Sequence, residues 1–215
     1  MSLSPIKALL TQLNHRLDSA RPAVQMWVFA AVGTLLTSLF FFLTRPAVER
    51  HETQSLLATL EELMPEKALT PAAFKEAVEV QAMASGLSKV QLYRLREGER
   101  IDALFLKATT PEGYSGDIEF AMVVRPEGQI VGVRVLRHRE TPGLGDWIET
   151  ARSSWIRAFE GKSLEDPTEM LWRVKKEGGM FDQFTGATIT PRAVVKGVHD
   201  SLKILKAQGE TRERP

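Results

Sequence analysis

The chain has 215 residues, of which 43% are hydrophobic, so it can bury one sizeable core but is too short for a multi-domain enzyme. Its 28 basic and 27 acidic side chains create no strong field of either sign, which argues against a nucleic-acid partner. The absence of cysteine excludes disulfides, thiolate nucleophiles and iron–sulfur clusters held by this chain. Any redox chemistry must therefore come from a cofactor.

An apolar run near the start of the chain predicts a transmembrane helix. Residues 23–43 contain no Asp, Glu, Lys or Arg. At about 1.5 Å per residue this helix crosses about 30 Å, the thickness of a bilayer core. A cleaved signal peptide is the alternative, but its apolar core is usually about 7–15 residues long. We therefore expect a retained anchor.

The charges that flank this run predict its orientation. Three basic residues precede the span and two follow it closely, a weak bias toward a cytoplasmic N-terminal segment, residues 1–22. The bulk of the chain would then lie outside the cytoplasm. In a Gram-negative cell, this places a single-pass protein in the inner membrane with its main domain in the periplasm.

The segment after the span, residues 44–70, is predicted to be a helical stalk. Leu56, Leu60 and Leu63 recur at helical spacing, and Pro65 ends the pattern. A second short helix is expected after Thr70. Residues 71–209 then form the folded domain.

Alternating apolar residues predict an antiparallel sheet between Val90 and Val135. Ile118, Phe120 and Met122 alternate with polar or small residues, as in a strand with one buried face. The turn sequence Arg-Pro-Glu-Gly at residues 125–128 separates this strand from the next and predicts a hairpin. The fold class is therefore α+β: a single N-terminal transmembrane helix followed by a mixed α/β domain with an antiparallel sheet.

Two further helices are expected toward the C-terminus. The first covers residues 148–159 and ends at Gly161, with Trp155 on its core face rather than acting as a stacking platform. The second begins with Thr190 as its N-cap and Pro191 in its first turn, and ends before Gly209. Residues 210–215 are expected to be a flexible tail.

Small and hydroxyl residues gather just before the last helix, in the run Thr185, Gly186, Ala187, Thr188, Ile189, Thr190. Unpaired backbone N–H groups and the helix dipole at such a helix start favour a phosphate. Lys175 or Lys176 could add positive charge. The plainer alternative is that the threonines only cap the helix and Gly186 makes a turn. Physical chemistry alone does not choose among the three threonines.

Three motifs together resemble a known family. The run Asp-Gln-Phe-Thr-Gly-Ala-Thr at residues 182–188 is similar to the site at which a flavin transferase attaches flavin mononucleotide (FMN). With His-Arg-Glu-Thr-Pro-Gly-Leu-Gly-Asp at residues 138–146 and Pro-Glu-Gly-Tyr-Ser-Gly at residues 111–116, it resembles the G subunit of the Rnf (Rsx) ion-translocating electron transport complex. The C subunit of the sodium-translocating NADH:quinone reductase shares the flavin motif and the single anchor. The likeness covers nearly the whole chain.

This resemblance implies a cofactor and its site. The hydroxyl of Thr188 is expected to form a phosphoester with FMN, an attachment that keeps the cofactor from being lost outside the cytoplasm. Tyr114 and Ser115 are expected to border the site, and His138 is either a surface strand residue or a proton donor. The other residues expected to bind the cofactor are Thr185, Gly186, Ala187, Glu140, Thr141, Leu144 and Lys175.

The resemblance also implies a function. The chain is expected to relay electrons through FMN within NADH and ferredoxin redox exchange coupled to ion transport, as a subunit of an oxidoreductase complex rather than a stand-alone enzyme. Its partners would be other membrane and redox subunits of the complex, and a flavin transferase for maturation.

Two other functional classes compete with electron relay. A hydrolase would need His138 or His199 beside a nucleophile, yet the chain lacks a Gly-x-Ser-x-Gly elbow. The second alternative is a non-catalytic, membrane-anchored binding or sensing domain. The scattered positions of the four histidines predict no metal site.

Overall fold

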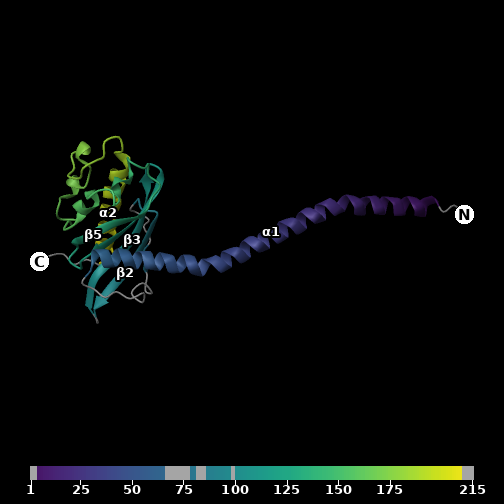
Figure 1. Ribbon diagram of the computed structural model, residues 1–215, viewed down its shortest axis with the longest axis horizontal. Coiled ribbons are helices and arrows are strands. Elements are labelled where there is room, and N and C mark those ends of the chain that lie inside the picture. Colours follow the sequence, from purple (N-terminus) through teal and green to yellow (C-terminus); the bar gives the residue numbers. More distant parts are fainter. Residues whose placement is uncertain (1–3, 66–77, 81–85, 98–99, 210–215) are drawn as a thin grey trace. The chain divides into compact units, whose positions relative to one another are not determined.

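The computed structural model describes residues 4–65, 78–80, 86–97 and 100–209 (Figure 1). The chain divides into two compact units, Met1–Glu52 and Thr53–Pro215. A long helix, α1 (Ser4–Leu63), begins in the first unit and ends in the second. The short helix expected after Thr70 lies outside the described residues.

In the first unit, α1 contains a segment long and apolar enough to cross a membrane. The segment is Val24–Arg45, with a mean hydropathy of 2.0, and its large apolar side chains are exposed. The hydroxyls of Thr34 and Thr37 each donate to a backbone carbonyl four residues earlier, at 2.8 Å. These bonds satisfy polar groups within the helix, as a lipid environment requires. The position agrees with the span expected at residues 23–43.

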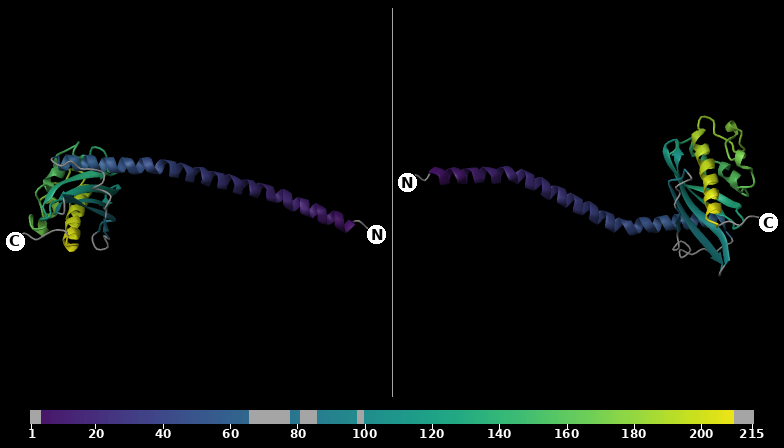
Figure 2. Two further views of the ribbon diagram at one scale, coloured as in Figure 1. Left: turned by 90° about the horizontal axis from the view of Figure 1, so that it is seen from below. Right: turned by 180° about the vertical axis from the view of Figure 1, so that it is seen from behind.

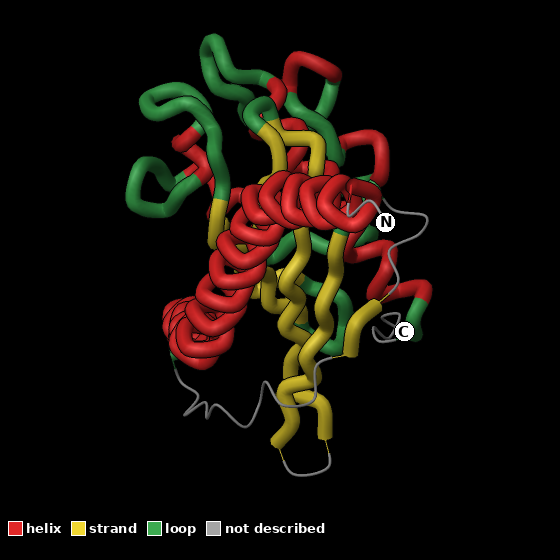
Figure 3. Tube along the Cα trace, turned by 90° about the vertical axis from the view of Figure 1, so that its right-hand side faces the viewer, coloured by secondary structure: helices red, strands yellow, loops and turns green. Residues whose placement is uncertain are grey.

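The second unit is built on a five-stranded antiparallel sheet in which each strand pairs with its neighbours in the sequence (Figures 1 and 3). Leu106 of the central strand lies opposite Met122, which in turn lies opposite Val133. The predicted sheet and its hairpin at residues 125–128 are confirmed. The strands are β1 (Val78–Val80), β2 (Lys89–Glu97), β3 (Arg100–Gly113), β4 (Gly116–Val124) and β5 (Ile130–Arg137).

Both faces of this sheet are covered, because successive side chains of a strand point to opposite sides. One face, which includes Leu104 and Leu106, packs in a hydrophobic cluster with the C-terminal helix α2 (Ile189–Ala207) (Figure 2). The other face carries a second cluster that includes the end of α1. The members of this second cluster are Leu56, Leu60, Leu63, Tyr93, Leu95, Ala103, Phe105, Ala121 and Val123.

A buried arginine paired with two exposed carboxylates accompanies this second cluster. Arg134 of β5 is only 8% exposed, and its Nε donates to Oε1 of Glu62 at 2.7 Å. Its guanidinium also lies 3.9 Å from the carboxylate of Glu160. The last turns of α1 are therefore fixed to the sheet by apolar packing and by charge.

The chain between β5 and α2 contains only short 3-10 turns, so the helix predicted at residues 148–159 is wrong. Ile148 and Phe159 are buried as expected, but Ala151 is exposed. The Ser153 hydroxyl donates to the backbone carbonyl of Trp147 at 2.6 Å and accepts the N–H of Trp155 at 3.1 Å. The Ser153 hydroxyl therefore bonds a backbone carbonyl and a backbone N–H that would bond other backbone groups in a continuous α-helix. The turns are η2 (Asp146–Ile148), η3 (Trp155–Phe159), η4 (Glu169–Leu171) and η5 (Lys175–Glu177).

Helix α2 begins earlier than expected. Its N-cap is Thr188, so the prediction of Thr190 as the cap is wrong. The Thr190 hydroxyl instead donates to the carboxylate of Glu140, fifty residues away in the sequence. The helix ends before Gly209, as predicted, and Gly209 adopts a left-handed conformation with φ of 68°.

Candidate functional site

Three segments far apart in the sequence meet around a cavity of about 590 Å³. They are the tip of the β3–β4 hairpin, the loop that follows β5, and the turn that leads into α2. Pockets of this size accommodate cofactors and drug-sized ligands. The lining residues are Tyr114, Glu140, Thr141, Leu144, Gly145, Lys176, Gly186, Ala187, Thr188, Ile189 and Thr190.

Glu140 joins the three segments. Its side chain is buried, with 4% of the residue exposed. One carboxylate oxygen accepts the backbone N–H of Ser115 at 2.9 Å. The other accepts the N–H of Tyr114 at 3.3 Å and the hydroxyl of Thr190. Because buried charge is costly unless it is hydrogen-bonded, these three donors explain how the carboxylate is held inside the wall.

Two glycines allow this close packing. A Cβ atom at Gly145 would lie 2.8 Å from Cβ of Glu140 and 3.0 Å from the hydroxyl oxygen of Thr190. A Cβ atom at Gly113 would lie 2.2 Å from the carbonyl oxygen of Gly116. Any side chain at these positions would push the wall segments apart.

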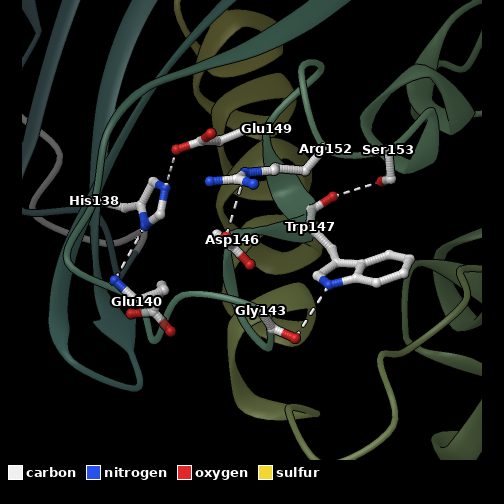
Figure 4. Close-up of polar contacts among 8 residues, drawn as sticks. All are labelled: His138, Glu140, Gly143, Asp146, Trp147, Glu149, Arg152 and Ser153. Atoms are coloured by element: carbon white, nitrogen blue, oxygen red, sulfur yellow. Dashed lines mark hydrogen bonds and ion pairs between the residues drawn. The ribbon is translucent and has the colours of Figure 1, made fainter.

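His138 supports the loop that carries Glu140 (Figure 4). Its Nδ1 accepts the backbone N–H of Glu140 at 3.0 Å, so the ring proton of the neutral form is on Nε2. Nε2 lies 2.7 Å from Oε1 of Glu149 and donates to it. His138 is therefore neither a plain surface residue nor part of the cavity lining, and both of its ring nitrogens are engaged.

Further contacts hold the same loop (Figure 4). The indole N–H of Trp147 donates to the carbonyl of Gly143 at 3.3 Å. Arg152 lies 3.4 Å from the carboxylate of Asp146, a residue that is only 5% exposed. The loop between β5 and η3 is thus braced at several points beside the cavity.

The turn before α2 is equally well fixed. The N–H of Ala187 donates to the carbonyl of Phe184 at 3.1 Å, and Gly186 has φ of 81°, a conformation that favours glycine. The Phe184 ring packs against Trp155, with a centroid distance of 5.2 Å. The Trp155 indole packs on the core, as predicted, and donates to the carbonyl of Asp182 at 2.7 Å.

The structure distinguishes the three threonines that the sequence left equivalent. Thr185 is exposed at the tip of the turn. Thr190 is 1% exposed, and its hydroxyl is engaged by Glu140. Thr188 lines the cavity at the N-cap of α2, and its side chain makes no capping hydrogen bond. Thr188 is therefore the threonine of the three that lines the cavity while its side chain neither caps the helix nor bonds Glu140.

The electrostatics of this cavity favour an anion near Thr188. The N-terminus of α2, a helix of 19 residues, presents unpaired N–H groups and the positive end of its dipole there. Lys176 lines the cavity, whereas Lys175 does not. Lys175 is instead paired with Asp182 at 2.6 Å, so Lys176 is the lysine of the two that brings charge to the cavity, and Lys175, expected to bind the cofactor, lies outside its lining.

The titratable groups with perturbed pKa values lie elsewhere. Burial lowers the pKa of His199 to about 4, and its ring stacks on Trp172 with a centroid distance of 5.1 Å. Burial also raises the pKa of Asp200. Neither residue lines the cavity, so a hydrolytic site built on His199 gains no support from this geometry.

Some of these partners could not be identified from the sequence. The hydrogen bonds of Glu140 join residues 25, 26 and 50 positions apart in the sequence, and no local sequence pattern predicts them. Glu149 as the partner of His138 was also missed. The Glu-Thr-Pro-Gly run marked the loop, but the direction in which each side chain points depends on tertiary packing.

Comparisons with known proteins agree on one family. The sequence model of the FMN-binding domain matches residues 113–203, a range that includes every residue lining the cavity. The chain is 40% identical over 197 residues to the G subunit of the ion-translocating oxidoreductase complex of Pseudomonas aeruginosa, covering 91% of this chain and 92% of that protein.

Two further relatives have the same name. The G subunit of Cronobacter sakazakii is 41% identical over 175 residues, covering 81% of this chain and 84% of that protein. The G subunit of Vibrio vulnificus is 37% identical over 184 residues, covering 85% and 87% respectively. The similarity therefore extends well beyond the FMN-binding domain.

Proposed function

The chain belongs to the G-subunit family of ion-translocating oxidoreductase complexes, and from this premise we propose that it relays electrons through an FMN esterified to Thr188. The protein acts within a membrane complex that couples NADH and ferredoxin redox exchange to ion transport. It is an electron-transfer subunit and not a stand-alone enzyme.

The observation that carries this proposal is the setting of Thr188. Thr188 lines the cavity and its side chain makes no capping bond, while the hydroxyl of Thr190 is engaged by Glu140 and Thr185 is exposed at a turn. A phosphodiester at Thr188 keeps one negative charge. The N–H groups at the start of α2 and the ammonium of Lys176 are the groups that would hold it.

The rest of the cavity fits a flavin as well. Tyr114, Leu144 and Ile189 are lining residues that leave 42% to 68% of their surface exposed, so they offer apolar area to a planar ring. Thr141 and Gly145 line the same wall. When bound, FMN supplies the reversible electron transfer that no side chain of this cysteine-free chain can provide.

We further propose that α1 anchors the protein in the bacterial inner membrane, with the domain of residues 71–209 in the periplasm. Val24–Arg45 has the required length and composition, and the flanking basic residues favour a cytoplasmic N-terminus. Anchoring confines the domain beside its membrane partners and raises their effective concentration. Protease added to intact spheroplasts should cleave the domain; protection until lysis would contradict this orientation.

Maturation requires a flavin transferase that recognises residues 182–188. Phe184 and Gln183 are occupied by contacts inside the fold, since Gln183 accepts the backbone N–H of Lys176 at 3.1 Å. Asp182 and Thr185 remain exposed. The transferase therefore has the polar side of the turn available for contact.

A pair of variants tests the attachment site. The full chain is produced in cells that contain the transferase, denatured, and separated on a gel that is inspected for flavin fluorescence. Thr188→Ala should abolish the fluorescence and the electron transfer of the assembled complex. Thr185→Ser, which keeps a hydroxyl at the exposed position of the same turn, should retain both. Fluorescence retained by Thr188→Ala would refute the attachment, and a wild-type chain without flavin would favour a binding or sensing domain.

A further inference from the structure

We propose that Glu140 places a fixed negative charge in the wall of the cavity and thereby lowers the reduction potential of the bound flavin. This inference rests on the proposed function, because it assumes that FMN occupies the cavity beside Thr188. It gives Glu140 a role in tuning that is distinct from attachment.

The charge of Glu140 follows from its hydrogen bonds. The backbone N–H groups of Tyr114 and Ser115 can only donate, and the Thr190 hydroxyl donates as well. An ionised carboxylate is the form that accepts from all three partners. Glu140 lines the cavity and is only 4% exposed to solvent. Water therefore does little to screen its charge from a ligand in the cavity.

The position of the charge is also fixed. The backbone N–H of Glu140 is held by Nδ1 of His138, and His138 is held in turn by Glu149. The absence of a side chain at Gly145 lets the loop pack directly on the Glu140 side chain. The Glu140 side chain therefore cannot turn away from the cavity without breaking its bonds to two other segments, the β3–β4 hairpin and the start of α2, so its field is preorganised.

A fixed negative charge opposes reduction. Uptake of two electrons and one proton by the isoalloxazine ring adds one negative charge to the flavin, with the electrons supplied by a redox partner of the complex. A cavity of 590 Å³ is equivalent to a sphere about 10 Å across. At that separation and an effective dielectric constant of about 20, a wall charge changes the ratio of reduced to oxidised flavin roughly tenfold.

Lys176 acts in the opposite direction but less strongly. It is the other charged side chain among the described residues that line the cavity, and it is exposed to solvent. The phosphodiester at Thr188 would also draw it toward the start of α2. Its charge is therefore screened and partly neutralised, while that of Glu140 is not.

The test uses the full chain carrying covalent FMN, titrated in an optically transparent electrode cell with redox mediators. Glu140→Gln removes the charge and keeps the shape of the side chain. Its amide oxygen can accept from Ser115 and its amide N–H can donate to Thr190, while the N–H of Tyr114 loses its acceptor. At a fixed potential near the midpoint, the ratio of reduced to oxidised flavin should rise about tenfold. Glu140→Asp keeps the charge and should stay close to the wild type.

Glu149→Gln is the matched control. Glu149 is a carboxylate that bonds His138 beside Glu140, but it does not line the cavity and is partly exposed. Its variant should shift the ratio by less than about twofold. Equal shifts in the Gln and Asp variants of Glu140 would assign the effect to packing and overturn the inference, as would an unchanged potential in Glu140→Gln.

The two proposals fail in different ways. A wild-type chain that carries no flavin on Thr188 overturns the proposed function. A wild-type chain that carries the flavin, together with a loaded Glu140→Gln variant of unchanged potential, leaves the proposed function standing and overturns the role of Glu140. Thermal unfolding of each variant in the Thr188→Ala background confirms that the fold is retained without the cofactor.

Discussion

Truncation of Leu60 to alanine should destabilise the folded unit strongly, although Leu60 belongs to the same helix as the membrane segment. The residue is 0% exposed and lies in the cluster that covers one face of the sheet. The change removes three carbon groups worth about 0.8 kcal/mol each, or about 2.4 kcal/mol, and the cavity that remains raises the cost to about 3 kcal/mol.

Urea unfolding of the full, flavin-free chain in a mild detergent measures this cost, with tryptophan fluorescence as the signal. Trp172 is 4% exposed and lies in the cluster on the opposite face of the sheet, so it reports on the whole unit. Glu61→Ala is the matched control, because Glu61 is the exposed neighbour on the same helix and its loss should cost less than about 0.5 kcal/mol. Equal free energies of unfolding for the two variants would refute the view that the end of α1 is part of the core.

Three other outcomes follow from the structure. The folded chain should lose stability as the pH falls from 6.5 to about 4, because the unfolded chain protonates His199 near 6.5 whereas burial lowers its folded pKa to about 4. In urea unfolding at pH 7.5 and 4.5, His199→Gln should reduce that loss by on the order of 1–2 kcal/mol, a figure that allows for solvent screening. If the free energy of unfolding fell by the same amount between the two pH values in the variant and the wild type, the prediction would be contradicted. Thr190→Val leaves one donor missing from the buried Glu140 carboxylate and should cost about 1–3 kcal/mol in thermal unfolding, whereas Thr185→Val at the exposed turn should cost less than about 0.5 kcal/mol. Gly145→Ala forces a Cβ atom to 2.8 Å from Cβ of Glu140 and should reduce the amount of covalent flavin seen on denaturing gels. An amount equal to that of the wild type would show that the cavity wall can move to accept the methyl group.

The regular parts of the fold could be predicted from local patterns. Ile118, Phe120 and Met122 alternate because they lie on the face of β4 that packs in the cluster with α2, and that periodicity is visible without any knowledge of the partner strands. The span at Val24–Arg45 is similarly local, since it depends on composition and length alone. Each of these signals is summed over many residues, which makes it robust.

The irregular region could not be predicted in the same way. The apolar residues of 148–159 suggested a helix, but the side chain of Ser153 captures backbone groups and turns the chain. Thr190 resembled an N-cap, but Glu140 holds its hydroxyl and leaves Thr188 at the cap. In both places a single polar side chain forms a hydrogen bond that the sequence pattern does not show.

The candidate site was predicted in part. The motif at residues 182–188 indicated the right turn, and Glu140, Thr141 and Leu144 lie in the cavity wall with it. Lys175 was predicted to bind the cofactor, but Lys176 lines the cavity. Neighbouring residues on a turn point in different directions, and the ion pair that holds Lys175 to Asp182 is not visible in the sequence. The way Glu140 joins distant segments depends on contacts that sequence spacing does not encode.

The most direct test of the central claim is the mass of the tryptic peptide of residues 177–192, which contains Thr185, Thr188 and Thr190. The peptide is taken from chain produced in cells that have the flavin transferase, and fragmentation assigns the modified residue. We expect the mass of one FMN less one water, located on Thr188. An unmodified peptide, or a flavin located on Thr185 or Thr190, would contradict the proposed attachment.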